Sequence, residues 1–251
     1  MKRRGRKDLE RFNAKYRRGR GGYAPPVGDP EAVAAAGPRR KVFSWIYFFC
    51  IPALMAFSTL CFFVAYGVSA GMDGAGESWL VFIAGTAVSL LIWSQLQLIK
   101  IRTLIHEFKH AMAVMFAGGK VDRIAVDDDG SGQIEYTYPE DAEQYAPIIA
   151  LAPYCFPLLS FPALLAALVS PAEFKLYYAF GLGLAFASDF STGIRDLGPH
   201  QSDIEDIVGR FYLAGMFLAA AHFAWFSILA IWVGGGRHGF TELWQMVVRS
   251  L

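Results

Sequence analysis

The sequence predicts an all-α polytopic membrane protein with about five transmembrane helices and a small cytoplasmic β-hairpin insertion. Two observations carry this prediction. Of the 251 residues, 55% are hydrophobic and only 18% are charged, whereas soluble domains average about 25% charged residues. The apolar residues are also gathered in long runs instead of being spread along the chain. This composition argues against a soluble cytosolic enzyme, a disordered chain and a nucleic-acid-binding protein.

The charges are distributed unevenly. Residues 1–41 contain 13 of the 23 Lys and Arg and 4 of the 22 Asp and Glu, a local charge of +9, which leaves −8 for the remaining residues. Because basic segments tend to stay in the cytoplasm, we predict a flexible basic cytoplasmic arm over residues 1–42. Its cations are suited to anionic lipid headgroups. No aromatic stacking platform accompanies them, so we expect no nucleic acid as a partner.

Apolar segments long enough to span a bilayer follow the arm. They are Phe43–Ala70, Trp79–Ile99, Ala146–Val169, the shorter Phe174–Asp189, and Val208–Val233. Since about 20 helical residues cross the roughly 30 Å hydrocarbon core, the fourth must be tilted, short or partly buried in protein. We therefore predict a membrane-embedded domain over residues 43–234 and a C-terminal tail over residues 235–251.

The positive-inside rule predicts the orientation of these segments. With the basic arm in the cytoplasm, the loop Gly71–Ser78 lies outside, and it contains no Lys or Arg. Residues 118–145 and 190–207 are then cytoplasmic, and the C-terminal tail is outside. We expect an integral protein of the plasma (inner) membrane with a cytoplasmic N-terminus.

Residues 119–140 differ in character from the apolar segments. Two β-rich stretches flank the sequence Asp127-Asp-Asp-Gly-Ser-Gly132, which favours a hairpin turn. The acidic triplet in this turn has two interpretations, a divalent-cation site and a solvated hairpin tip, and the second is favoured. We predict a cytoplasmic β-hairpin inserted into the membrane domain.

One motif points to chemistry: His106-Glu107-Phe108-Lys109-His110, in a stretch without Pro or Gly. Residues four apart lie on the same face of an α-helix, so both imidazoles can bind one metal ion. Glu107 lies beside that face and can take a proton from a water molecule. Two imidazoles with a carboxylate suit Zn²⁺ and leave a coordination position open. The alternative is an interfacial helix whose histidines face headgroups or water.

A third protein ligand should come from another segment at the same cytoplasmic level. Asp189 is the favoured candidate, because it is the one acidic residue at the end of an apolar helix, where an unpaired carboxylate is costly. Asp196, His200 and Asp203 in the following loop remain alternatives. Asp189 also has a structural interpretation, in which it pairs with Arg195 or caps a short helix.

Taken together, these features resemble the site-2 protease family of intramembrane zinc metalloproteases, over residues 80–205. The likeness rests on His106-Glu-Phe-Lys-His110, the following Gly118-Gly119, the β-rich insertion and Leu151-Ala-Pro153. The resemblance implies zinc ligation by His106, His110 and a later aspartate, matched here to Asp189, with Glu107 as general base. Lys109 stands where the family commonly has Gly, and Ser188-Asp189-Phe190 replaces an Asp-Gly signature, so the chain resembles a distant member.

We therefore predict hydrolysis of peptide bonds in a membrane-protein or peptide substrate, near the cytoplasmic leaflet of the bilayer. A first alternative is a non-catalytic membrane protein that uses the zinc site as a structural or binding element. A second is a transporter with Glu107, Asp189 and His222 on a permeation path. An edge of the hairpin could bind an extended substrate through backbone hydrogen bonds.

Overall fold

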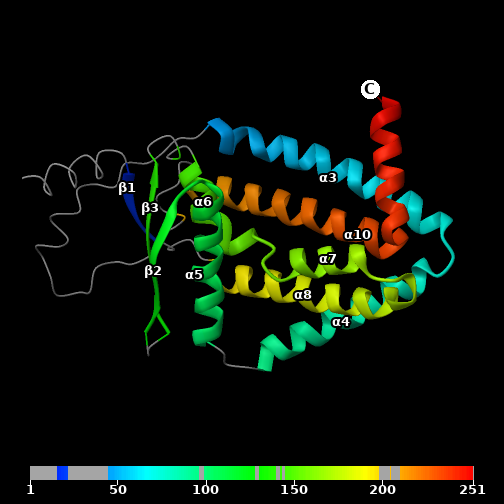
Figure 1. Ribbon diagram of the computed structural model, residues 1–251, viewed down its shortest axis with the longest axis horizontal. Coiled ribbons are helices and arrows are strands. Elements are labelled where there is room, and N and C mark those ends of the chain that lie inside the picture. Colours follow the sequence, from blue (N-terminus) through cyan, green and yellow to red (C-terminus); the bar gives the residue numbers. More distant parts are fainter. Residues whose placement is uncertain are drawn as a thin grey trace, which may run out of the picture. The chain divides into compact units, whose positions relative to one another are not determined.

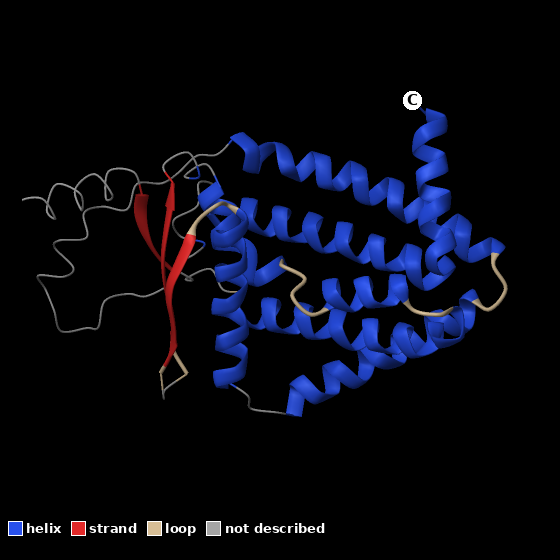
Figure 2. Ribbon diagram, viewed as in Figure 1, coloured by secondary structure: helices blue, strands red, loops and turns tan. Residues whose placement is uncertain are grey.

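The computed structural model describes residues 16–21, 45–95, 99–127, 130–139, 142, 145–197, 204 and 210–250. Helices dominate these residues, and the strands are confined to one small sheet (Figure 2). The elements, in chain order, are β1 (Tyr16–Gly21), α3 (Trp45–Gly71), α4 (Ala75–Gln95), α5 (Ile99–Phe116), β2 (Lys120–Val126), β3 (Gly132–Pro139), α6 (Ala146–Cys155), α7 (Ser160–Val169), the 3₁₀ helix η2 (Ala172–Phe174), α8 (Lys175–Asp196) and α10 (Arg210–Ser250).

The chain divides into two compact units, which are described separately. The first, here called the sheet unit, consists of Met1–Phe48, Leu98–Tyr154 and Asp196–Gly215. The second, the bundle unit, consists of Phe49–Gln97, Cys155–Arg195 and Met216–Leu251. The predicted zinc motif belongs to the sheet unit and Asp189 to the bundle unit.

In the sheet unit, β2 and β3 form the predicted antiparallel hairpin. Its turn is closed by the amide of Asp127, which donates to the carbonyl of Ser131 at 2.9 Å. The strand order is β1-β3-β2, so β3 is central (Figure 1). The β1 strand comes from the basic arm, which we predicted to lack regular structure. Backbone pairing with β3 orders these six residues, and the rest of the arm lies outside the described residues.

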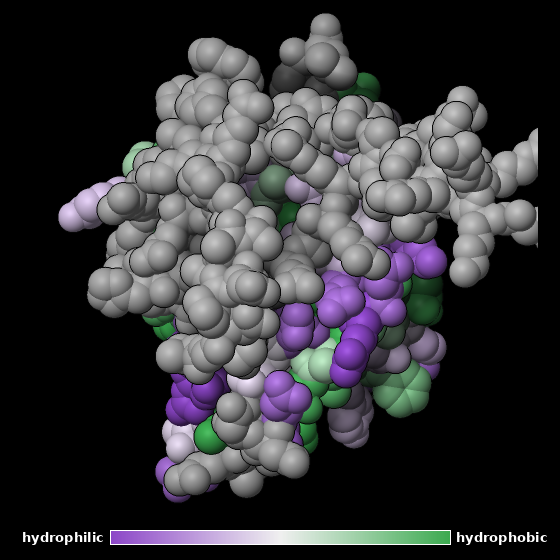
Figure 3. Space-filling view, turned by 90° about the vertical axis from the view of Figure 1, so that its left-hand side faces the viewer, coloured by the Kyte–Doolittle hydropathy of each residue, from purple (hydrophilic) through white to green (hydrophobic). Residues whose placement is uncertain are grey.

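A tight turn joins α5 to the hairpin. Gly118 ends the helix with φ of 78°, a left-handed conformation that glycine adopts without strain. A Cβ on Gly119 would lie 2.8 Å from the carbonyl oxygen of Thr137 in β3. The Gly118-Gly119 pair therefore lets the sheet start directly beside the end of α5. On the face shown in Figure 3, hydrophilic residues gather beside hydrophobic ones.

The bundle unit has an apolar core formed by α3, α4, α7, α8 and α10. Its fully or nearly fully buried members include Phe82, Leu164, Leu182, Leu229 and Trp232. A second cluster joins Cys61, Val64 and Ala65 of α3 to Ala230 and Ile231 of α10. Large apolar side chains also face outward, among them Phe63, Tyr66, Leu80 and Leu91, each at least 62% exposed. Exposed apolar residues along long helices are typical of a lipid-facing surface.

Small residues bring α4 and α8 into close contact. A Cβ on Gly85 would lie 2.2 Å from the carbonyl oxygen of Phe180, and one on Gly183 would lie 2.1 Å from that of Phe82. Close to this contact, Ser89 and Ser188 share a hydrogen bond of 2.9 Å. In a lipid bilayer there is no hydrophobic driving force for helices to associate. Membrane helices therefore pack through small residues and interhelical hydrogen bonds, as α4 and α8 do.

Three helices among the described residues are long and apolar enough to cross a membrane, over Phe49–Gly71, Ala75–Gln95 and Tyr212–Gln245. The predicted third segment is broken into α6 and α7, which together could form a fourth span. The predicted count of about five is thus not confirmed. The fourth predicted segment lies in the helix α8. This helix is not among the candidate spans, and it contains the charged residues Lys175, Asp189, Arg195 and Asp196.

The C-terminal residues also differ from the predicted tail. The helix α10 continues to Ser250, with a break at Gly236, where φ is 59° and ψ is −139°. After this break the helix runs in a new direction (Figure 1). A positive φ is accessible to glycine without strain, and this explains why the change of direction occurs within Gly234-Gly235-Gly236.

Candidate metal centre

The helix α5 carries the complete His-Glu-x-x-His motif, as the sequence predicted. One helical turn separates His106 from His110, and their ring centroids lie 5.2 Å apart. His110 is only 2% exposed, and the side chain of His106 is 14% exposed. The helix therefore places two imidazoles side by side in a largely buried environment.

The orientation of His110 is set by α6. The Nδ1 atom of His110 lies 2.9 Å from the carbonyl oxygen of Ile149. A carbonyl oxygen can only accept a hydrogen bond, so this contact requires the proton to be on Nδ1. The lone pair is then on Nε2, the nitrogen that this neutral tautomer offers to a metal ion.

A carboxylate lies beside the first histidine. An Oδ2 atom of Asp196 is 3.5 Å from Nδ1 of His106, and Oδ1 of the same residue is 3.0 Å from Nε of Arg102. Arg102 precedes His106 by one helical turn, so Asp196 lies along the face of α5 that carries both histidines. The ring of Tyr154 from α6 packs edge-on against His106, with centroids 5.5 Å apart.

Glu107 is buried against the start of β3. Only 5% of this residue is exposed. A Cβ on Gly132 would lie 2.6 Å from Oε1 of Glu107, so the strand backbone rests directly on the carboxylate. The hydroxyl of Thr103, one turn earlier in α5, donates to the carbonyl of Gly130 at 2.8 Å. These contacts tie the hairpin to the helix that carries the motif.

Asp189 accepts hydrogen bonds from other residues of the bundle unit. Its carboxylate accepts hydrogen bonds from the backbone amides of Leu159, at 3.1 and 3.2 Å, and of Ser160, at 2.8 Å. It also accepts one from the Ser160 hydroxyl at 2.7 Å. Asp189 thus satisfies the amides at the N-terminus of α7, the capping role given above as its structural interpretation. Arg195, the other partner considered, donates instead to the carbonyl of Trp93 at 2.7 Å.

The other histidines and acids considered belong to the bundle unit or lie outside the described residues. His222 packs against the ring of Phe190, with centroids 5.1 Å apart, and His238 pairs with Glu242 at 3.4 Å. His200 and Asp203 lie outside the described residues. Within the described ranges, no three His, Cys, Asp or Glu side chains are arranged so that they could hold a metal ion.

Sequence reasoning did not identify Arg102, Tyr154, the carbonyl of Ile149 or Gly132 as neighbours of the motif. The position of Arg102 beside the motif could have been predicted from sequence, since Arg102 is four residues before His106 and shares its helix face. The other three come from segments whose position depends on tertiary packing. Lys109, noted as a departure from the family pattern, is fully buried.

The fold and the motif define a helical membrane protein with a buried His-Glu-x-x-His helix. A family model described as Peptidase M50B-like matches residues 78–233, which is more than half of the chain and includes α5 and α8. The chain belongs to this family, which is a site-2 protease family. Membership supports a peptidase and an integral membrane protein at the general level. No curated protein and no solved structure gives a match.

Proposed function

We propose that this protein is an intramembrane zinc metalloendopeptidase that hydrolyses peptide bonds of a membrane-associated protein near the cytoplasmic leaflet. The observation that carries the proposal is the pair of adjacent imidazoles on α5 with the buried carboxylate of Glu107 beside them. Membership of the Peptidase M50B-like family supports the same reaction.

The two imidazoles on α5 suit zinc as ligands, and within the described residues no third His, Cys, Asp or Glu is yet in position beside them. His106 and His110 would hold the ion through ring nitrogens, and the bond from His110 to Ile149 already selects the tautomer that leaves Nε2 for it. When bound, zinc polarises the scissile carbonyl and makes a water molecule more acidic. A metal that keeps an open position requires one further protein ligand.

We propose Asp196 as that ligand in preference to Asp189, the candidate chosen from sequence. Asp196 lies along the helix face of both histidines, with Oδ2 3.5 Å from Nδ1 of His106, and would turn from Arg102 toward the metal. Asp189 would have to give up its four hydrogen bonds to Leu159 and Ser160, and buried amides left without partners are costly. Asp189 is then a structural residue that fixes the start of α7.

Glu107 is the proposed general base. Its carboxylate would accept a proton from the attacking water and pass it to the nitrogen of the departing amine. Burial under Gly132 restricts the rotamers of Glu107 and keeps bulk water away from it. A positioned base of this kind contributes about 10²–10⁴-fold to a rate.

We propose that an extended substrate pairs with β3 by displacing β1. The six residues of β1 pair with β3 in an uninterrupted register, from Tyr16 opposite Pro139 to Gly21 opposite Ile134. The pairing of β2 with β3 is irregular between Val121 and Arg123. The outer edge of β2 is therefore less suited than β3 to pair with a substrate strand. Strand addition through backbone hydrogen bonds tolerates varied sequences, as a protease substrate site requires.

The test uses the full chain, purified and reconstituted in vesicles with a panel of single-span model membrane proteins. Glu107→Gln should keep its zinc and lose cleavage by about 10²–10⁴-fold, whereas His106→Ala should lose both. Glu173→Gln, the same change at an exposed position of the bundle unit, should keep both. Undiminished cleavage by Glu107→Gln, with zinc bound, would instead show that a different group is the base. Zinc binding without cleavage by the wild type would support the non-catalytic alternative.

A further inference from the structure

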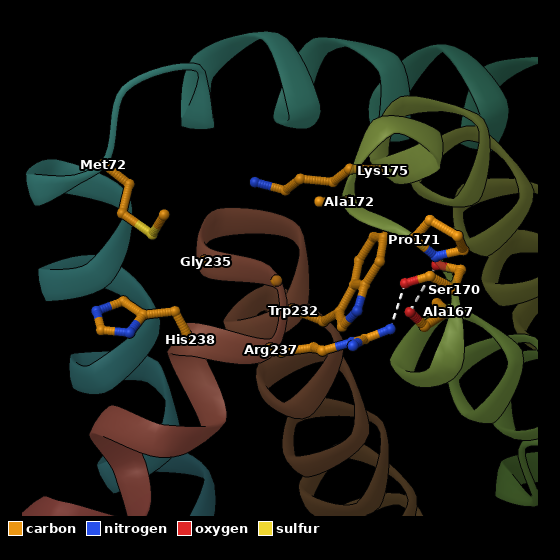
Figure 4. Close-up of a pocket in the computed structure, with 11 residues that line it drawn as sticks. Met72, Ala167, Ser170, Pro171, Ala172, Lys175, Trp232, Gly235, Arg237 and His238 are labelled. Atoms are coloured by element: carbon orange, nitrogen blue, oxygen red, sulfur yellow. Dashed lines mark hydrogen bonds between the residues drawn. The ribbon is translucent and has the colours of Figure 1, made fainter.

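The bundle unit contains a cavity of about 300 Å³ at one end of its helices. Three segments line it: Met72 after α3, the turn from Ala167 to Lys175 between α7 and α8, and Trp232 to His238 around the break in α10 (Figure 4). This volume is several times the roughly 30 Å³ that one molecule takes up in liquid water. A phosphate-sized headgroup fits within it.

Two cations line this cavity from different elements. The ammonium of Lys175 donates to the carbonyl of Gly234 at 3.4 Å, and the guanidinium of Arg237 donates to the carbonyl of Ser170. Each bond satisfies one donor with a neutral oxygen, which leaves the positive charge and further N–H groups. Across the part of the chain that is described, neither cation has a carboxylate within ion-pair distance. His238, by contrast, faces Glu242.

A mainly apolar groove lies next to this cavity. A second cavity of about 260 Å³ shares Met72 and His238 with the first. Phe63, Val64, Gly67 and Val68 of α3 line it, and Glu242 lies in its wall together with His238. A Cβ on Gly67 would have nothing within 4 Å, so the groove is open at this point.

The position of the cavity matches the depth of lipid headgroups. Met72 directly follows the candidate span Phe49–Gly71 and precedes the candidate span Ala75–Gln95. The end of a span lies where hydrocarbon gives way to the polar headgroup region. Trp232 in the wall adds an aromatic residue of the kind enriched at this level.

We propose that this cavity binds the phosphate headgroup of an anionic phospholipid, with one acyl chain in the groove along α3. Lys175 and Arg237 neutralise the phosphate, and the groove gives the acyl chain an apolar surface next to the bilayer. Paired basic residues in a pocket between membrane helices are suited to such headgroups. This site is separate from the proposed peptidase reaction and does not depend on it.

The test measures lipid retention by native mass spectrometry of the full-length protein in detergent. Phosphatidylglycerol is compared with phosphatidylcholine of the same acyl chains. The wild type should retain phosphatidylglycerol preferentially, and the double variant Lys175→Gln/Arg237→Gln should retain it about tenfold less. Arg249→Gln, an exposed cation further along α10, should match the wild type. The basic arm is unchanged in all variants, so differences report on the cavity.

Gly67→Phe, which fills the groove, should also weaken retention, and excess inorganic phosphate should fail to displace the lipid. Equal retention by the double variant and the wild type would overturn the proposal, as would equal binding of the two lipids. Complete displacement by phosphate would indicate a site for the free ion and would overturn the lipid assignment. If the double variant unfolds, Lys175→Gln alone tests the same point, because the bond from Arg237 to Ser170 is then intact.

Discussion

The Nδ1 atom of His110 and the carbonyl oxygen of Ile149 lie 2.9 Å apart. This contact joins α5 to α6 and sets which ring nitrogen of His110 carries the proton. A metal-binding histidine is usually oriented in this way by a partner on its other nitrogen. The fold itself therefore leaves the lone pair of His110 on its other ring nitrogen, Nε2.

His110→Ala should abolish zinc binding, because it removes one of two adjacent imidazoles. Metal analysis of the purified protein measures this. His222→Ala is the matched control, since this histidine packs on Phe190 in the bundle unit, and it should keep the metal content of the wild type. Full zinc occupancy in His110→Ala would contradict the proposed metal centre.

Asp196→Asn and Asp189→Asn should differ in which property they change. Asp196→Asn should lose zinc with a small change in thermal stability, because Asp196 is proposed as a ligand. Asp189→Asn should keep zinc and lower the free energy of unfolding by about 1–3 kcal/mol, because it weakens the buried bonds to Leu159 and Ser160. Metal analysis and thermal unfolding in detergent separate the two. The opposite pattern would restore Asp189 as the ligand.

Gly132→Ala should lower cleavage of the model substrates while zinc remains bound. Its Cβ would lie 2.4 Å from Cγ2 of Thr103 and 2.6 Å from Oε1 of Glu107, so the glutamate or the strand must shift. Gly76→Ala is the control, since its Cβ would meet nothing within 4 Å. Unchanged turnover by Gly132→Ala would show that Glu107 does not depend on this contact.

Gly183→Ala should destabilise the bundle unit, whereas Gly181→Ala, two residues earlier in the same helix, should not. A Cβ at Gly183 would lie 2.1 Å from the carbonyl oxygen of Phe82, and one at Gly181 would lie in open space. Separating two packed helices to relieve such a clash costs about 1–3 kcal/mol. Thermal unfolding of the two variants compares them directly, and equal midpoints would argue against the α4–α8 contact.

Loosening β1 should raise cleavage if the substrate takes its place on β3. The double substitution Arg18→Pro/Gly19→Pro removes two neighbouring amide hydrogens. Successive amides of a strand point in opposite directions, so at least one of the two faces β3. Initial cleavage rates in vesicles measure the effect. Rates equal to or below those of the wild type would indicate that β1 does not compete with the substrate.

Much of the fold follows from local patterns in the sequence. Long apolar runs are helical because a backbone in lipid must satisfy its own hydrogen bonds, and α3, α4 and α10 form where such runs occur. The hairpin was predictable from its β-rich stretches and the turn residues between them. The strand β1 was not, because Tyr16–Gly21 is basic and rich in glycine and pairs with residues more than 110 positions away.

The helical period alone predicts that His106 and His110 share a helix face with Glu107 beside them. The sequence also limited the third ligand to a few acidic or imidazole residues near the end of α8. Asp189 and Asp196 are both carboxylates on the same helix, and only tertiary contacts give them different surroundings. Packing directs Asp189 to the amides of α7 and Asp196 to His106 and Arg102. Contacts between residues distant in sequence decide such roles, and no local pattern encodes them.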